Sequence, residues 1–254
     1  MVMIGVSCTE FSAHPLEEIM EAVSKEFGHW EIFAEAEHGL SLIWPRLNAL
    51  RSSYKMTFSL HSPISDTNLA SLTERMREAS ILEMISTAEL AAETGIKMIT
   101  VHPGLSSLSV PGMERKAVEM SRKSMRTLDR TASEYGVTYA IENMPNFPPM
   151  IGKTAAELGE IIEGTNLGVC FDIGHANTTG QTGEMISAFK DRIVNVHVHD
   201  NMGDNDSHMT VGDGTVDFPK AMGSLSWYKG RYIIESRSLA SAAESKRRLS
   251  ILIE

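Results

Sequence analysis

Eight short apolar stretches recur along the chain, and most are rich in β-branched or aromatic residues, which is typical of β-strands. They span residues 3–8, 29–35, 55–61, 97–102, 137–143, 167–175, 193–200 and 231–236. The stretch at 193–200 alternates strictly, because valines at 194, 196 and 198 are interleaved with Asn195, His197 and His199. Side chains alternate across a strand. One face of this strand is therefore suited to a core, and the other carries an amide and two imidazoles.

Longer stretches with helical periodicity lie between the strands. The clearest cover residues 15–27, 69–95, 113–136, 154–164 and 239–254. Pro15 suits a first helical turn, and Thr154 suits a helix N-cap. Gly95 and Gly136 each follow a helical stretch, as C-terminal capping glycines do.

A strand followed by a helix, repeated eight times, predicts a parallel sheet with helical crossovers. Eight such units in 254 residues match the size of a (β/α)₈ TIM barrel in the α/β class. A doubly wound open sheet is the alternative, but the chain has no G-x-G-x-x-G after its first strand. We find no linker-like tract, so we expect residues 1–254 to form one TIM-barrel domain.

The composition narrows the class of protein without naming an activity. A hydrophobic fraction of 42% and a charged fraction of 22% are ordinary for a globular chain. The formal net charge of −10 leaves no basic footprint for nucleic acid or an anionic membrane. No apolar run reaches the length of a membrane span, and no signal peptide is recognisable. Cys8 and Cys170 lie in separate apolar stretches and are expected to be buried thiols, which fits a cytoplasmic location.

Polar residues gather where the predicted strands end, and that end carries the chemistry of a barrel. They are His61, His102, Glu142, Asp172, His175, His197 and Glu235, and the loop after the seventh strand adds Asp206 and His208. Several carboxylates in one narrow mouth repel one another unless a cation is bound. Histidine and carboxylate ligands suit Zn²⁺ or Mn²⁺. We interpret His14, His29 and His38 as surface or packing residues, and Asp200 as a cap of the loop.

The motifs SLHSP, TVHPG, IEN, FDIGHAN, HVHDN, DSHMTVGDGTVDF and IIES together resemble the xylose-isomerase-like TIM-barrel superfamily. This superfamily includes sugar isomerases and epimerases and the endonuclease IV family of abasic-site nucleases. The resemblance covers nearly the whole chain. One departure concerns the loop after the metal histidine of the seventh strand, where sugar epimerases often carry an arginine and this chain has none.

The resemblance implies a divalent metal and leaves its count open at one to three ions. In the isomerase branch the matching positions for one metal are Glu142, Asp172, His197 and Glu235. In the endonuclease branch, further zinc ions would be held at positions that match His61, His102 and Glu142, and at positions that match His175, Asp206 and His208. Every one of these positions carries the required residue type.

The segments after the strands are poor in the Lys and Arg side chains that bind phosphates. Only Arg46, Lys153 and Arg237 occur there, whereas acidic residues are frequent. The basic residues cluster instead in the helix at 113–136, on the outside of a barrel. A small uncharged sugar-like substrate is therefore expected rather than DNA, and a homo-oligomer stays open.

We therefore expect a metal-dependent isomerase or epimerase that moves a proton next to a metal-chelated carbonyl. Glu142 and Glu235 would act as general base and acid, and His175 would stabilise the charged intermediate. Arg237 and His199 are expected to bind substrate, with His199 alternatively supporting a metal ligand by hydrogen bonding. The alternative activity is a zinc phosphodiesterase that acts on abasic DNA. A non-catalytic binder is disfavoured, because it has no need of both glutamates.

Overall fold

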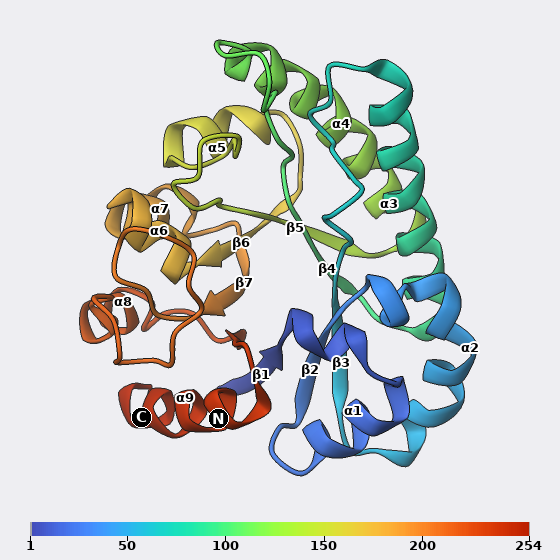
Figure 1. Cartoon of the computed structure of the whole chain (residues 1–254), viewed down its shortest axis with the longest axis vertical. Helices are drawn as coiled ribbons and strands as arrows, with labels where there is room; N and C mark the ends of the chain where they lie inside the picture. The colour runs from blue at the N-terminus through green and yellow to red at the C-terminus, as the bar shows by residue number, and fades with distance from the viewer. Residues whose placement is uncertain (1, 254) are drawn as a thin grey trace.

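The eight predicted strands close into a parallel barrel. A computed structural model describes residues 2–253, and in it each strand pairs with its neighbours in sequence while β1 also pairs with β8, Met3 opposite Arg231. The strands are β1 (Met3–Ser7), β2 (His29–Phe33), β3 (Thr57–His61), β4 (Met98–Val101), β5 (Thr138–Glu142), β6 (Gly168–Asp172), β7 (Ile193–Val198) and β8 (Arg231–Glu235). Figure 1 shows them at the centre of a ring of helices. The predicted TIM barrel is confirmed.

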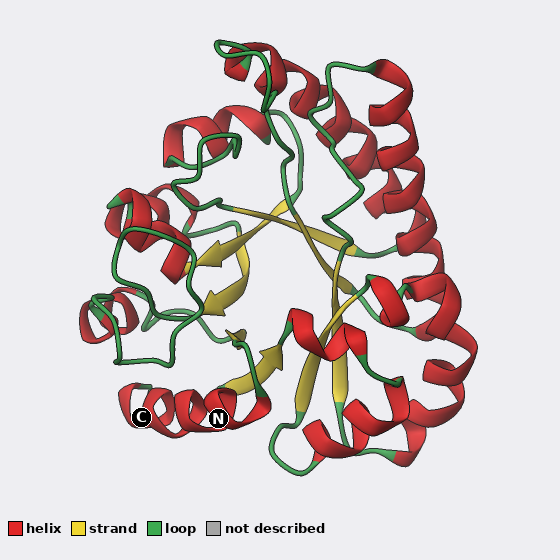
Figure 2. Ribbon diagram, viewed as in Figure 1, coloured by secondary structure: helices red, strands yellow, loops and turns green. Residues whose placement is uncertain are grey.

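Helices follow the strands and form the outer layer (Figure 2). They are α1 (Leu16–Ser24), α2 (Leu40–Leu50), α3 (Glu74–Thr94), α4 (Glu114–Tyr135), α5 (Ala155–Ile161), α6 (Ile173–Thr179), α7 (Thr182–Phe189), α8 (Phe218–Ser224) and α9 (Leu239–Leu252), with short 3₁₀ turns at Thr9–Ala13, Ala36–His38 and Arg51–Ser53. The predicted caps are confirmed. Gly95 and Gly136 adopt φ of 73° and 63°, and the Thr154 hydroxyl accepts from the backbone N–H of Glu157.

The sixth strand is shorter than its sequence pattern predicts. A strand through His175 is wrong, because β6 ends at Asp172 and α6 begins at the next residue. The Asp172 carboxylate accepts the backbone N–H of His175 at 2.6 Å and so caps the helix. His175 therefore stands on the first turn of a helix that leaves the barrel mouth.

Outward-facing residues of the strands build the core between the sheet and the helices, and Trp30, Ile32 and Leu60 are fully buried there. The inward face is polar halfway down the barrel. Glu31, Ser59, Thr100 and Asn195 are all fully buried and joined by hydrogen bonds. A buried polar layer of this kind lies directly beneath the strand ends that carry the candidate ligands.

The remaining histidines take the structural places expected for them. His14 is exposed, and His38 is fully buried with its ring edge-on to Trp30. His29 is also fully buried and contacts the hydroxyls of Thr57 and Ser59 at 2.7 and 2.9 Å. Burial is the main reason that its pKa falls to about 4, so the imidazole is neutral.

Two further expectations concern the whole chain. Cys8 and Cys170 are free and buried, as predicted, and burial raises the pKa of the Cys8 thiol to about 11. Within residues 2–253, no helix has the length and apolar character that crossing a membrane requires.

Candidate metal-binding active site

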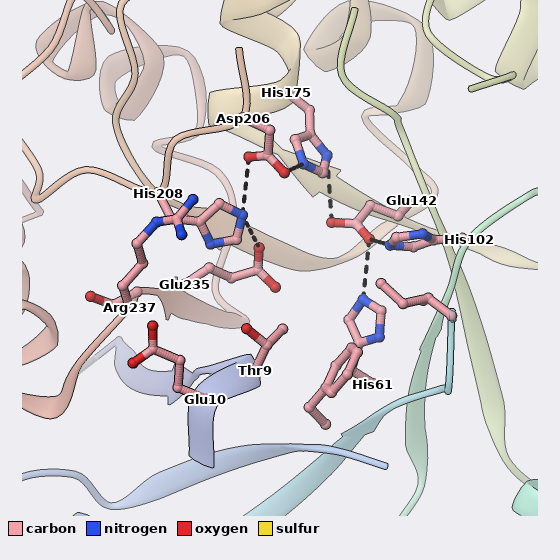
Figure 3. Close-up of a pocket in the computed structure, with 13 residues that line it drawn as sticks. Thr9, Glu10, His61, His102, Glu142, His175, Asp206, His208, Glu235 and Arg237 are labelled. Carbon is pink, nitrogen blue, oxygen red and sulfur yellow. Dashed lines mark ion pairs between the residues drawn. The ribbon is translucent and has the colours of Figure 1, made fainter. Parts of the chain in front are cut away.

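The strand ends and the loop after β7 bring all the predicted metal ligands to one place, the C-terminal mouth of the barrel. A cavity of about 200 Å³ opens there. Figure 3 shows its lining side chains, which include His61, His102, Glu142, His175, Asp206, His208 and Glu235. Asp172 and His197 are fully buried.

Four side chains surround one point at the centre of this group. Each of Glu142, Asp172, His197 and Glu235 offers a ligand atom, and these atoms lie within 4.8 Å of one another. The Nδ1 atom of His197 lies 2.9 Å from Glu142 Oε1, 3.1 Å from Glu235 Oε1 and 3.9 Å from Asp172 Oδ2. Three carboxylates and one imidazole from β5, β6, β7 and β8 thus share a single focus.

A second group lies on the β3–β5 side of the mouth. The Nε2 atoms of His61 and His102 lie 3.4 and 3.0 Å from Glu142 Oε2. His61 directs its other ring nitrogen to the carbonyl of Ser62 at 2.8 Å. A ring N–H donated to a carbonyl fixes the tautomer and leaves the opposite nitrogen free for a metal.

A third group is formed by α6, the end of β7 and the loop behind it. His175, His199, Asp206 and His208 place one ligand atom each within 4.8 Å of the others. The Nε2 atoms of His175, His199 and His208 lie 3.4, 3.3 and 3.0 Å from an oxygen of Asp206. His199 was not among the metal ligands that the resemblance implies.

The ligand atoms of these groups are better suited to bind divalent cations than to form hydrogen bonds with one another. Among the side chains of the three groups, four buried atoms have no hydrogen-bond partner: Glu142 Oε2, Asp172 Oδ2, Asp206 Oδ1 and His199 Nε2. Burial opposes ionisation of Glu142, but His197 and the other imidazoles outweigh it and lower the pKa of this carboxyl well below its usual value. Ionised oxygens without donors, beside imidazole nitrogens, are the ligand set that Zn²⁺ or Mn²⁺ takes.

Glu31 contributes to the site, and the sequence interpretation missed it. Its Oε1 lies 2.7 Å from Nε2 of His197, on the side of the ring opposite the candidate ligands. Ser59, Asn195 and Thr100 donate to the same carboxylate at 2.7, 2.9 and 3.2 Å. Burial opposes its ionisation, yet His197 lowers the pKa of Glu31 to about 2. An ionised Glu31 orients His197 so that Nδ1 faces the metal position.

The loop after β7 is organised by the carboxylate of Asp200, which is fully buried. It accepts backbone N–H groups at 2.9–3.1 Å from Asn201, Gly212, Gly214 and Val216. A Cβ on Gly214 would lie 2.4 Å from Asp200 Oδ1, so only glycine allows this approach. Asp200 thus fixes the loop that carries Asp206 and His208, in line with the interpretation that it caps the loop.

Asp200→Ala is expected to lower the free energy of unfolding by about 3 kcal/mol, because buried backbone donors lose a charged acceptor. Chemical denaturation measures this value. The matched control is Asp213→Ala in the same loop, whose half-exposed ion pair with Arg248 contributes at most about 1 kcal/mol. Equal losses in the two variants would show that the Asp200 carboxylate does not organise the loop.

The cavity wall also includes residues that the sequence interpretation did not select. Thr9, Glu10, Phe33, Ile64 and Ser236 line it together with the candidate ligands. Phe33 ends β2 and Ser236 closes the motif IIES, whereas Thr9, Glu10 and Ile64 lie in connections whose course is set only when the barrel closes.

The residues expected to bind substrate divide into two cases. Arg237 lines the cavity and donates from Nε to the carbonyl of Ser207 at 3.0 Å. His199 is fully buried behind the cavity lining, with Nε2 3.3 Å from Asp206 Oδ1, and its expected role in substrate binding stays a prediction. Arg46 lies in α2 and pairs with Glu17 of α1, away from the mouth.

Known proteins share both the sequence and the fold. Residues 21–252 match the family model described as xylose isomerase-like TIM barrel. An uncharacterized protein of Methanocaldococcus jannaschii is 33% identical, over 98% of this chain and 89% of its own. A probable endonuclease 4 of Aquifex aeolicus is 30% identical, over 64% of this chain and 63% of its own.

Solved structures agree with these matches. The crystal structure of a D-tagatose 3-epimerase-like protein has a TM-score of 0.92 at 31% identity and covers 99% of this chain and 97% of its own. Endonuclease IV from Thermus thermophilus, at 19% identity and a TM-score of 0.72, covers 99% of this chain and 98% of its own and shares the fold. The family match spans most of the chain, from α1 to α9. The chain belongs to the xylose isomerase-like TIM barrel family.

Proposed function

We propose that this protein is a divalent-metal-dependent isomerase or epimerase of a small sugar or related hydroxy-carbonyl compound. The observation that carries this proposal is the pair Glu142 and Glu235, which line the same cavity from β5 and β8 (Figure 3). Both carboxylates also approach Nδ1 of His197, at 2.9 and 3.1 Å. Each carboxylate has a second oxygen, so each is able to hold a metal and to exchange a proton with a substrate.

The residues that would hold the metal are Glu142, Asp172, His197 and Glu235. A divalent metal bound there would polarise a carbonyl and make the neighbouring C–H more acidic. Glu235 would take this proton as general base and, once protonated, would return it to the neighbouring carbon as general acid, which gives isomerisation. Epimerisation would need a proton on the opposite face, which Glu142 would deliver after taking one up from solvent. The pKa of Glu235 is lowered, because His197 outweighs the effect of burial, so the base is ionised at neutral pH.

His175 was expected to hydrogen-bond the polarised oxygen, and its hydrogen bonding supports a different assignment. Its Nδ1 contacts the carbonyl of Asn143 at 2.8 Å, which requires an N–H there. Its other nitrogen, Nε2, lies 3.4 Å from Asp206 Oδ2, so this nitrogen is directed to a carboxylate of the site and not to a substrate oxygen. We therefore assign the proton transfers to Glu142 and Glu235 alone.

The cavity suits an uncharged, hydroxylated substrate. Its lining contains carboxylates and imidazoles, and Arg237 is the one Lys or Arg among the lining residues described. The basic residues of α4 lie outside the barrel, where Arg115 and Arg122 pair with Glu160 and Glu163 of α5. The 31% identity to a D-tagatose 3-epimerase-like protein supports a sugar substrate.

A zinc phosphodiesterase that acts on abasic DNA is the second candidate. Three groups of candidate ligands and the 30% identity to a probable endonuclease 4 favour it. Against it stands the acidic mouth, because DNA affinity comes mainly from Lys and Arg contacts to phosphates.

No appreciable binding or nicking of a synthetic abasic duplex is expected at physiological salt, with zinc or manganese supplied. A gel assay on the purified protein measures both, with an undamaged duplex as the control substrate. Metal-dependent nicking at the abasic site that disappears in His102→Ala would overturn the isomerase proposal in favour of the nuclease.

A further inference from the structure

We propose that His199 completes a second, closed metal site with His175, Asp206 and His208. In this site four protein ligands saturate the ion, so that it has a structural role. The inference rests on the proposed function only in placing the reacting metal elsewhere, among Glu142, Asp172, His197 and Glu235. The ligand set that the resemblance implies for a third zinc of the endonuclease branch consists of His175, Asp206 and His208 and has no fourth protein ligand.

The spacing of the donor atoms matches four-coordinate zinc. Tetrahedral bonds of about 2.0–2.1 Å place neighbouring ligand atoms about 3.3 Å apart. The Nε2 atoms of His199 and His208 lie 3.3 and 3.0 Å from Asp206 Oδ1, and Nε2 of His175 lies 3.4 Å from Oδ2 of the same carboxylate. The Asp206 carboxylate would therefore have to rotate for one oxygen to serve as the fourth ligand beside all three rings.

The hydrogen bonds of the rings leave the correct nitrogens free. His175 directs Nδ1 to the carbonyl of Asn143 at 2.8 Å, and His199 directs Nδ1 to the carbonyl of Asp200 at 3.4 Å. Both rings therefore present Nε2 lone pairs to the same point. Among the described residues, Nε2 of His199 and Oδ1 of Asp206 are buried with no hydrogen-bond partner, although a buried polar atom rarely lacks one.

The alternative role for His199, a hydrogen bond that supports Asp172, fits less well. Its Nε2 lies 3.2 Å from Asp172 Oδ1, but that oxygen already accepts the backbone N–H of His175 at 2.6 Å. With Nδ1 facing the Asp200 carbonyl, Nε2 faces the carboxylates of Asp172 and Asp206 together. A divalent cation at that point would displace the proton from Nε2 and bind the ring nitrogen and a carboxylate oxygen at once.

The backbone around the group is shaped to admit the His199 ring. A Cβ on Gly174 would lie 2.1 Å from this imidazole, so α6 passes it only with glycine at that position. His208 stacks on His199 with ring centroids 4.4 Å apart, and it adopts a φ of 49°. A left-handed histidine is strained, and such strain persists where the surroundings hold it in place.

In tetrahedral geometry four protein ligands fill the coordination shell of Zn²⁺, as in structural zinc sites. The reacting metal among Glu142, Asp172, His197 and Glu235 also has four protein ligands, so it would need a fifth or sixth position to bind a substrate oxygen. The ion of the closed site would instead join α6, β7 and the loop at 200–217, and so fix one wall of the substrate cavity. The chemical class of the ligand is a divalent cation that accepts three imidazoles and one carboxylate in tetrahedral geometry, of which Zn²⁺ is the natural representative.

Cobalt titration of the metal-free protein tests this inference, because four-coordinate Co²⁺ absorbs visible light much more strongly than five- or six-coordinate Co²⁺. We expect wild type to bind an ion with the intense four-coordinate spectrum. His199→Ala is expected to lose that spectrum and to bind the ion at least tenfold more weakly. Glu235→Gln is the matched control at the other site and should keep the intense spectrum, as should His14→Ala, an exposed histidine.

Circular dichroism reports whether His199→Ala folds. If it does not, His208→Ala replaces it as the test, because this substitution removes a ligand from a surface loop. An unchanged cobalt spectrum and affinity in the folded His199 variant, or in His208→Ala where that variant decides, would overturn the inference. Failure of the proposed function looks different. If wild type gives the intense spectrum and His199→Ala abolishes it, while no sugar or keto compound is turned over, the closed site stands and the isomerase proposal fails.

Discussion

Glu235→Gln is expected to lower turnover by about 10²- to 10⁴-fold while most of the bound metal is retained, since a positioned general base contributes about that factor. The amide keeps an oxygen for coordination but cannot accept the substrate proton. Ligand and base are separable here because Glu235 lies 3.1 Å from His197 Nδ1 and also lines the cavity.

The measurement for Glu235→Gln combines metal content by mass spectrometry with deuterium uptake from solvent at the carbon next to the carbonyl. Its substrate comes from a screen of small ketoses and hydroxy-keto compounds. Asp172→Ala is the matched control, because it removes a ligand that is fully buried. In this control metal and activity should fall together, and excess metal should restore part of the rate. Wild-type turnover and exchange in Glu235→Gln would leave Glu235 as a ligand only and move the base role to Glu142.

Glu31→Gln is expected to weaken binding of the catalytic metal by about 10- to 100-fold, the usual effect of removing a group that orients a metal ligand. The substitution preserves volume, but it replaces an acceptor of four hydrogen bonds with an amide. The amide then turns donors of its own toward Ser59 and Asn195, which already donate. His197 loses its fixed orientation, although Glu31 itself does not touch the metal position.

Calorimetric titration of the metal-free protein with Zn²⁺ or Mn²⁺ measures the effect of Glu31→Gln. The control is Glu10→Gln, which removes the same charge from an exposed side chain in the cavity lining and should change affinity little. A merely structural role for Glu31 would lower the unfolding free energy of the apoprotein and leave metal affinity at the wild-type value. That result would reject Glu31 as a positioning residue.

The barrel could be predicted because its signals are local. Apolar stretches, helical periodicity and glycine caps each depend on a few neighbouring residues, and Gly95 and Gly136 adopt the left-handed conformation that their positions indicated. The sixth strand shows where local signals fail. The apolar pattern continues past Asp172, but the cap bond from its carboxylate starts a helix, and only the folded backbone shows that bond.

The site residues that could be predicted from the sequence are those that lie at the ends of strands. Glu31 does not end a strand, and its partner His197 is distant in sequence. The two meet because the closed sheet turns the inner faces of β2 and β7 toward each other across the barrel. For His199, the alternation along β7 correctly predicted that the side chain points to the inside of the barrel. It did not predict that the side chain is fully buried. Its burial beneath the loop at 200–217 depends on how Asp200 folds that loop.

The candidate ligands are contributed by segments from β3 to β8, so they are far apart in the chain although they meet within a few ångströms. An ion held by Glu142, Asp172, His197 and Glu235 would cross-link four strands, and a fragment that stops short of either end of residues 142–235 lacks part of this ligand set. Metal occupancy and folding then form one linked equilibrium, in which free metal stabilises the native chain by RT ln(1 + [M]/Kd). Starvation for the metal would therefore reduce the amount of folded protein as well as its activity, and so couple its abundance in the cell to metal supply.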